Sequence, residues 1–150
     1  MHVFMTSSED GLVKIWDRRS NTSVAQLISP TRAPLHSVSS SKSLIAAGTN
    51  EDILLWDIHS LSKPIGHFQE CHNDDVTGLA FNSDGNGFIS CSVDYVLTMF
   101  NLSQSTSKRL KEDEVVDGAY SCLQPMNHCG YVTDEIIWAQ TTINTVEFIR

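Results

Sequence analysis

One short pattern recurs along the chain: two residues of a predicted strand, then an aromatic residue, then Asp or Asn. It occurs at residues 14–17 (KIWD), 54–57 (LLWD) and 98–101 (TMFN), with a weaker copy at 146–149 (VEFI). The aromatic positions lie 40, 44 and 48 residues apart. A period of about 40–45 residues is typical of a four-stranded β-sheet that forms one blade of a β-propeller. The spacing therefore predicts an all-β chain built from repeated blades.

The repeats divide the chain into four predicted blades. They are an incomplete first blade at 1–29, a second at 30–70, a third at 71–112 and an incomplete fourth at 113–150. Closed propellers usually have about 4–8 blades, so we expect a partial propeller of about three and a half four-stranded antiparallel blades. We interpret the chain as a fragment, an incomplete gene model or a splice product. Its open ends would need missing blades or an oligomer to cover them.

The apolar pattern also predicts where the individual strands lie. In the third blade we expect strands at 76–81, 88–92 and 96–102, with an outer strand near Leu110. The other predicted strands lie at 1–7, 12–16 and 24–28, then at 35–38, 44–48, 53–58 and 65–68, and finally at 120–123, 136–141 and 145–149.

Composition narrows the possible partners. The chain has 18 acidic and 10 basic residues, a formal charge of −8, so broad binding to nucleic acid or to an anionic membrane is disfavoured. No apolar run approaches the ~18 residues of a membrane span, and the start lacks the pattern of a signal peptide. None of the four cysteines forms a CxxC pair. Reduced thiols in the cytoplasm or the nucleus, or both, are the simplest interpretation.

The best repeats carry a recognisable motif. Residues 88–101 (FISCSVDYVLTMFN) follow His72 and the turn at 81–85 (FNSDG), and residues 8–17 (SEDGLVKIWD) match over a shorter stretch. These residues resemble the WD40 repeat family, and within it the group called WD repeat-containing protein 89. The resemblance covers the first two thirds well and the last third weakly. It implies a non-catalytic scaffold for protein–protein interaction, without a cofactor.

The same resemblance implies a structural hydrogen-bonded tetrad. WD40 blades often have a His before the first strand, a Ser or Thr on the second, an Asp in the turn and a Trp on the third. In the third blade these roles fall on His72, on Ser90 or Ser92, and on Asp94. Phe100 replaces the Trp and has no N–H to donate.

The other blades match the tetrad less well. The first copy supplies Asp10 and Trp16, whereas the second has Thr31 near the place of the His and a shortened turn at 50–52. No copy shows a complete tetrad, so we expect apolar packing to carry more of the stability, at roughly 25 cal/mol per Å² buried.

Two chemical alternatives fit the sequence less well than this structural interpretation. His72, Ser92 and Asp94 could be mistaken for a hydrolase triad, but no oxyanion site is signalled. Zinc ligands could be imagined among Cys71, His72, Cys122, His128 and Cys129, but they lack the short paired spacing of zinc sites. We therefore expect neither an enzyme nor a metal site.

A four-residue motif gives a second functional hypothesis. Trp16, Asp17 and Arg19 match the WDxR signature of WD40 proteins that dock on the adaptor of cullin-4 ubiquitin ligases, with Arg19 as the contact residue in that resemblance. The chain would then be a substrate receptor. The alternative is a solvated turn that contains two arginines.

Charge placement predicts two rims. In a propeller, blade-to-blade connections and the turns between second and third strands share one face. The acidic residues in those segments, here called the acidic rim, are Glu9, Asp10, Glu51, Asp52, Glu70, Asp74, Asp75 and Asp94. The opposite connections hold the basic rim: Arg18, Arg19, Lys42, Lys63, Lys108, Arg109 and Lys111.

Two interpretations of the rims stay open. Turns are commonly polar, which would make the charges incidental. Alternatively, the acidic rim attracts a basic peptide or protein, because complementary fields speed encounter and select partners. The basic rim lacks aromatic stacking signals, which makes RNA a poor candidate.

Overall fold

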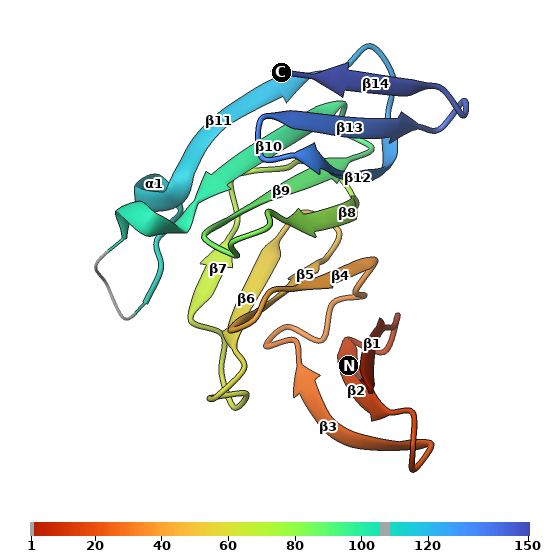
Figure 1. Ribbon diagram of the computed structural model, residues 1–150, viewed down its shortest axis with the longest axis vertical. Coiled ribbons are helices and arrows are strands. Elements are labelled where there is room, and N and C mark those ends of the chain that lie inside the picture. Colours follow the sequence, from red (N-terminus) through yellow and green to blue (C-terminus); the bar gives the residue numbers. More distant parts are fainter. Residues whose placement is uncertain (1, 106–108) are drawn as a thin grey trace.

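The computed structural model describes residues 2–105 and 109–150. Within those ranges the chain forms four antiparallel sheets that follow one another in an arc (Figure 1). The first and last sheets have three strands each, and the two middle sheets have four. The predicted all-β fold is confirmed. Among the described residues, no helix has the length and hydropathy needed to cross a bilayer.

The first two sheets follow the predicted strands closely. The first has the order β1-β2-β3, with β1 at Val3–Ser7, β2 at Leu12–Asp17 and β3 at Thr22–Ile28. The second has the order β4-β5-β6-β7, with strands at Ser37–Ser40, Leu44–Gly48, Ile53–Asp57 and Gly66–Phe68. The period-two apolar pattern therefore located the strands of these sheets correctly.

The last two sheets contain the remaining strands. The third sheet is formed by β8 at Val76–Phe81, β9 at Gly87–Ser92, β10 at Val96–Asn101 and β11 at Val116–Ser121. The fourth is formed by β12 at Met126–Thr133, β13 at Ile136–Thr141 and β14 at Val146–Ile149. Between β10 and β11 lie a 3-10 turn, η1 at Leu102–Gln104, and a one-turn helix, α1 at Glu112–Val115.

Two predicted strands were wrong in the last third of the chain. The outer strand of the third sheet is β11 and not a segment near Leu110, because β11 pairs with β10 along its length. Residue Leu110 instead forms a parallel bridge with Gly66 at the edge of the second sheet. The segment 120–123, expected to open the fourth blade, thus ends the third, and the boundary expected at residue 112 moves beyond Ser121.

The true inner strand of the fourth sheet is β12, which sequence analysis missed. Its polar and glycine residues, Asn127, His128 and Gly130, interrupt the apolar alternation that marks a strand. Pairing shows its place clearly, since β12 pairs with β13 and lies against β8 of the preceding sheet.

The fourth aromatic anchor is also corrected. Phe148 was aligned with Phe100, yet Phe148 is 70% exposed on the outward face of the last sheet. Register places Ile149 opposite Ile137, and both side chains pack in the cluster shared with the third sheet. The inward position of the repeat therefore falls on Ile149, one residue later than the spacing suggested.

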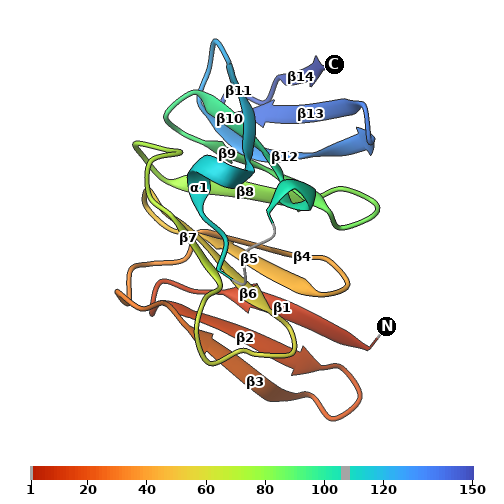
Figure 2. The same ribbon diagram turned by 90° about the vertical axis from the view of Figure 1, so that its left-hand side faces the viewer.

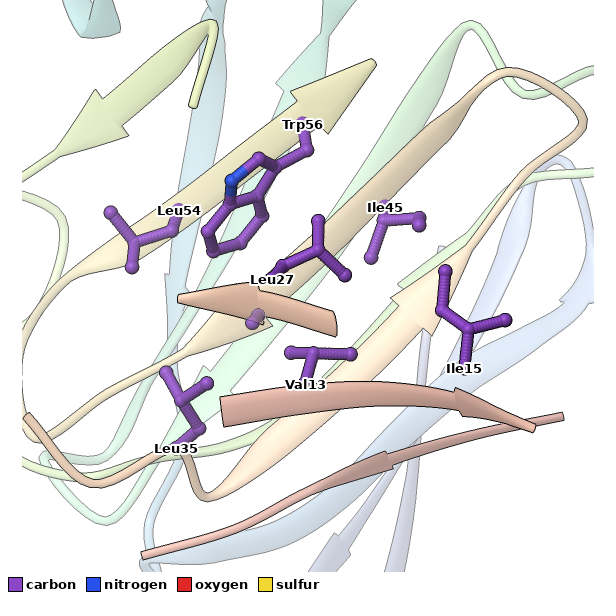
Figure 3. Packing of buried hydrophobic residues seen from close by; sticks show 8 residues of the cluster. Val13, Ile15, Leu27, Leu35, Ile45, Leu54 and Trp56 are labelled. Atoms are coloured by element: carbon purple, nitrogen blue, oxygen red, sulfur yellow. The ribbon is translucent and has the colours of Figure 1, made fainter. Parts of the chain in front are cut away.

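The core lies between consecutive sheets, as three apolar clusters. Alternation along β5 and β6 turns Ala47, Leu54 and Trp56 toward the first sheet, whereas Ala46 and Leu55 face the third. Figure 3 shows the first of these clusters, whose labelled residues are Val13, Ile15, Leu27, Leu35, Ile45, Leu54 and Trp56. Each middle sheet is thus buried on both faces, as stacking of repeats requires.

The helix α1 lies beside β7 (Figure 2), and a polar link joins it to the connection between the second and third sheets. The Glu112 carboxylate accepts the backbone N–H of Gln69 at 2.8 Å and of Glu70 at 3.0 Å. It also accepts the thiol of Cys71, whose Sγ lies 2.7 Å away. Burial and the adjacent Glu112 raise the pKa of this thiol, so Cys71 stays protonated.

Candidate protein-interaction rim

The connections that hold the acidic rim lie at one end of the sheets. Strand direction alternates, so the β1–β2, β3–β4, β5–β6, β7–β8 and β9–β10 connections all emerge at the same end. Backbone hydrogen bonds join neighbouring connections: Leu35 N–H to Ser8 O at 3.1 Å, and Val76 N–H to Thr49 O at 2.9 Å. The rim is therefore a continuous, hydrogen-bonded surface.

Three carboxylates of the acidic rim lie beside histidine rings. Asp52 Oδ2 lies 2.7 Å from His67 Nε2, and Asp75 Oδ1 lies 3.3 Å from His36 Nε2. A third pair, between Asp94 and His72, is buried inside the third sheet.

The remaining carboxylates give the rim its outward charge. Glu9, Glu51 and Asp74 are exposed, and within 2–105 and 109–150 none of them forms an ion pair. Asp10 is also exposed and accepts the backbone N–H of Leu12 at 3.1 Å, while Glu70 is exposed beside α1. These carboxylates create a negative electrostatic field at this end of the sheets.

A small polar cavity opens at the same end, between inner strands. It has a volume of about 320 Å³ and is lined by His36, Asp75, Thr77, Asn127 and His128. These residues come from the starts of β8 and β12 and from the segments leading into β4 and β8. The Asp75 carboxylate gives this cavity a hydrogen-bond acceptor.

The opposite end carries the basic rim. The turns there hold Arg18, Arg19, Lys42 and Lys63, and the β10–β11 connection holds Arg109 and Lys111; Lys108 lies outside the described residues. The same end also holds Asp84 and Glu135, so its positive charge is less uniform than the basic residues alone suggest.

The third sheet contains the most complete tetrad. His72 Nδ1 lies 3.1 Å from Asp94 Oδ2, and His72 Nε2 lies 2.6 Å from Ser90 Oγ. Because a carboxylate only accepts, Nδ1–H donates to Asp94, and the Ser90 hydroxyl donates to Nε2 of the neutral ring. Burial lowers the pKa of His72 and outweighs the opposing influence of Asp94, so the ring is neutral.

Ser92, expected as a tetrad residue, has a different role. Its Oγ donates to the backbone carbonyl of Asp74 at 3.0 Å and accepts the N–H of Asp94 at 3.0 Å. Ser90 and Ser92 face the same side of β9, so position along the strand decides the choice. Ser90 lies opposite Thr98, whereas Ser92 ends β9 beside the turn that carries Asp94. Ser92 thus shapes the turn, and Ser90 completes the contact with His72.

The aromatic position differs among the sheets. In the first sheet, Trp16 Nε1–H donates to Thr6 Oγ1 at 3.0 Å, a partner that sequence analysis did not identify. In the second sheet, Ala47 occupies the register position of Thr6, and the buried Nε1 of Trp56 has no partner among the described residues.

The third sheet replaces this hydrogen bond by ring stacking. Phe100 stacks on Phe88 with centroids 4.2 Å apart and planes 5° apart, and Phe68 of the second sheet lies 5.5 Å from Phe100. Such aromatic pairs contribute about 0.5–1.5 kcal/mol beyond area burial. The Phe100 substitution therefore keeps the apolar contact across the blades while losing the donor.

The WDxR residues lie in and after β2. Trp16 is half-buried and stacks on Phe4 at 6.2 Å. The Arg19 side chain is 69% exposed, and its Nη2 and Nε lie 2.7 and 3.1 Å from the two Asp17 oxygens. The Arg19 guanidinium lowers the pKa of the Asp17 carboxyl below its usual range. Asp17 thus contacts Arg19 through both carboxylate oxygens at the surface.

Four groups of residue types common in active sites are buried or make structural hydrogen bonds. His72, Ser90 and Asp94 are buried in the tetrad, and burial raises the pKa of the Cys122 thiol to about 11. Among the described residues, no group of three or more His, Cys, Asp or Glu is placed to hold a metal ion.

The stacked sheets and their inter-sheet cores define the chain as an arc of β-propeller blades. A chain in the crystal structure of the mitotic checkpoint complex superposes with a TM-score of 0.80 at 19% identity, which shows the same fold. The match covers 98% of this chain and 44% of that chain.

Family comparisons give the same class. The model of the WD domain, G-beta repeat, matches residues 1–17 and 62–101. The WD repeat-containing protein GTS1 of Arabidopsis thaliana is 29% identical over 97% of this chain, and the chain spans 37% of that protein. The WD repeat-containing protein 89 homolog of Dictyostelium discoideum is 30% identical over 69% of this chain and 28% of its own length. The chain is a WD40 repeat protein.

Proposed function

We propose that this chain is a non-catalytic protein-interaction scaffold whose acidic rim binds a basic segment of a partner protein. The continuous rim around the cavity at His36 and Asp75 carries this proposal. Exposed carboxylates at Glu9, Glu51 and Asp74 would steer a basic partner toward the cavity by long-range attraction. A Lys or Arg side chain could then donate to the Asp75 carboxylate.

The test uses the association rate of a basic probe. A fluorescent peptide that alternates lysine and glycine is mixed with the chain by stopped flow at rising salt. The combined variant Glu51→Lys and Asp74→Lys should lower the association rate at low salt by about tenfold, because steering falls with the field. The matched control is the combined variant Asp84→Lys and Glu135→Lys at the opposite end, which changes the net charge equally and should change the rate little.

Two results would contradict the proposal. One is an association rate that does not respond to salt, since steering between exposed charges must be screened. The other is an equal loss in the rim variant and in the combined variant Asp84→Lys and Glu135→Lys, because net charge alone would then explain binding.

A second candidate function is that of a substrate receptor of a cullin-4 ubiquitin ligase. The orientation of the exposed Arg19 by Asp17 favours it, because a pre-ordered guanidinium loses little freedom on docking. The chain would then dock on the ligase adaptor through Trp16, Asp17 and Arg19.

This candidate is tested by co-purification with the ligase adaptor from cells. Arg19→Asp should abolish recovery of the adaptor, whereas Arg18→Asp, the same charge change one residue earlier, should leave it. Persistence of adaptor binding in Arg19→Asp rejects the receptor role.

The narrower family group and the cell compartment belong to the same proposal. Membership in the WD repeat-containing protein 89 group is supported by the Dictyostelium relative. A cytoplasmic and nuclear location is supported by four free cysteines, as thiols stay reduced there. Microscopy of the tagged protein tests the location, and finding it only in a secretory compartment would contradict it.

A further inference from the structure

A pocket with a strongly basic lining lies between the first and second sheets, away from the cavity of the acidic rim. It has a volume of about 570 Å³, and its wall is formed by the residues after β3, the loop before β7 and the segment that bridges to β7. Its cations are Arg32, Lys63 and Arg109, with His67 beside them.

The three cations lack acidic partners. Across residues 2–105 and 109–150, neither Arg32, Lys63 nor Arg109 forms an ion pair, although the whole chain has 18 acidic residues against 10 basic ones. Like charges that gather around a concavity repel one another unless an anion joins them. The arrangement therefore favours an anionic ligand.

Backbone geometry fixes the turn from which the Arg32 side chain extends. Its φ is 55°, a left-handed conformation that costs a non-glycine residue energy and concentrates at functional positions. Its N–H donates to Ser29 O at 3.0 Å, and Ser29 N–H donates to Gly11 O at 2.9 Å. Gly11 leaves room for this turn, because a Cβ there would lie 2.9 Å from Arg32 Cα.

The opposite wall is fixed as well. Leu110 N–H donates to Ile65 O at 2.8 Å, which places Arg109 beside the second sheet. His67 Nε2 lies 2.7 Å from Asp52 Oδ2, so the ring is held in one orientation. Backbone contacts thus set the positions from which the Arg32 and Arg109 side chains extend on the two sides of the pocket.

We propose that this pocket binds a phosphorylated segment of a partner protein. A phosphate carries nearly two negative charges and several acceptor oxygens, which suit two arginine forks and a lysine. Ile28 and Pro64 in the lining offer apolar contact to a neighbouring side chain of the segment. An anionic membrane fits less well, because the chain's net charge of −8 opposes approach to a negative surface.

The test compares two peptide libraries on the immobilised chain. One library has a fixed central phosphoserine with degenerate flanks, and the other has serine at that position. The phosphorylated library should be retained selectively and displaced by inorganic phosphate. Arg109→Glu and Arg32→Gly should each lower retention by about tenfold, since each removes a charged donor. Glycine tolerates the φ of Arg32, so Arg32→Gly keeps the fold.

The matched control is Lys42→Glu, an exposed lysine on another turn, which should leave retention unchanged. Equal retention of the two libraries overturns the proposal, as does an equal loss in Lys42→Glu. Vesicles that contain phosphatidylserine form a separate arm. Binding to vesicles but not to phosphopeptides, lost in Arg109→Glu, would assign the pocket to lipid and overturn the proposal as well.

Discussion

The unpaired indole of Trp56 leads to a substitution that should stabilise the chain. Trp56 is fully buried, and its Nε1–H has no partner within the part of the chain that is described. In the first sheet, the equivalent Trp16 donates to Thr6 Oγ1 at 3.0 Å. Ala47 occupies the register position of Thr6, diagonal to Trp56 on the same face. Ala47→Ser should therefore supply the missing acceptor.

The size of the effect follows from two contributions. A buried donor without a partner costs about 1–3 kcal/mol, and a hydrogen bond contributes about 0.5–1.5 kcal/mol net. Fitting one oxygen beside a side chain with no exposed surface recovers less than the full sum, because the added atom crowds its neighbours. We expect a net gain of about 1 kcal/mol, or about 2–4 °C in Tm for a chain of this size.

The assay is urea and thermal unfolding of Ala47→Ser, of Trp56→Phe and of the double variant that combines the two. Ala46→Ser is the matched control, since Ala46 is equally buried but faces the third sheet, where the hydroxyl would lack this donor. In a Trp56→Phe background, Ala47→Ser should become destabilising, because the hydroxyl then has no N–H to accept. Equal destabilisation by Ala47→Ser and Ala46→Ser, or no coupling to Trp56, would refute the reasoning.

Three further predictions follow from the same geometry. Ser90→Ala should destabilise by about 1–3 kcal/mol in urea unfolding, because it leaves Nε2 of His72 unpaired in a buried site; no loss would place the ring's partner elsewhere. The pKa of His72 is lowered by burial, so below pH 6.5 the unfolded chain binds more protons than the folded one. The free energy of unfolding should therefore decrease as the pH is lowered through this range. His72→Phe should flatten that dependence, and an unchanged slope would contradict the assignment. Gly11→Ala should lower the free energy of unfolding by about 1–2 kcal/mol, since φ is +76° and the added Cβ meets the Arg32 backbone. An unchanged Tm would contradict this, because it would show that the turn can rearrange to admit the methyl group.

Much of the fold could be predicted because its signals are local. Strands such as Leu44–Gly48 and Ile53–Asp57 have strong apolar character and were located correctly. The third sheet's outer strand could not be placed in the same way, because β11 pairs across a connection that contains α1 and a register shift at Phe100. β12 escaped notice because its polar residues line a cavity and so break the apolar pattern.

In the candidate site, too, some residues could be identified from local sequence and others only from the tertiary structure. His72 and Asp94 were identified by spacing, but Ser90 could be separated from Ser92 only by the strand register. Likewise, the histidine partners of Asp52 and Asp75 come from other segments, which no local pattern connects to those carboxylates.

The sequence by itself determined that this chain repeats one strand pattern, with aromatic anchors at Trp16, Trp56 and Phe100. Local alternation suffices for that, because side chains on a strand face opposite sides with a period of two. Only the tertiary structure decided which polar atoms meet. It leaves the Trp56 indole without a partner among the described residues and gathers Arg32 and Arg109 around one pocket. Such contacts depend on register and on which loops adjoin, and these are set by the packing of whole sheets.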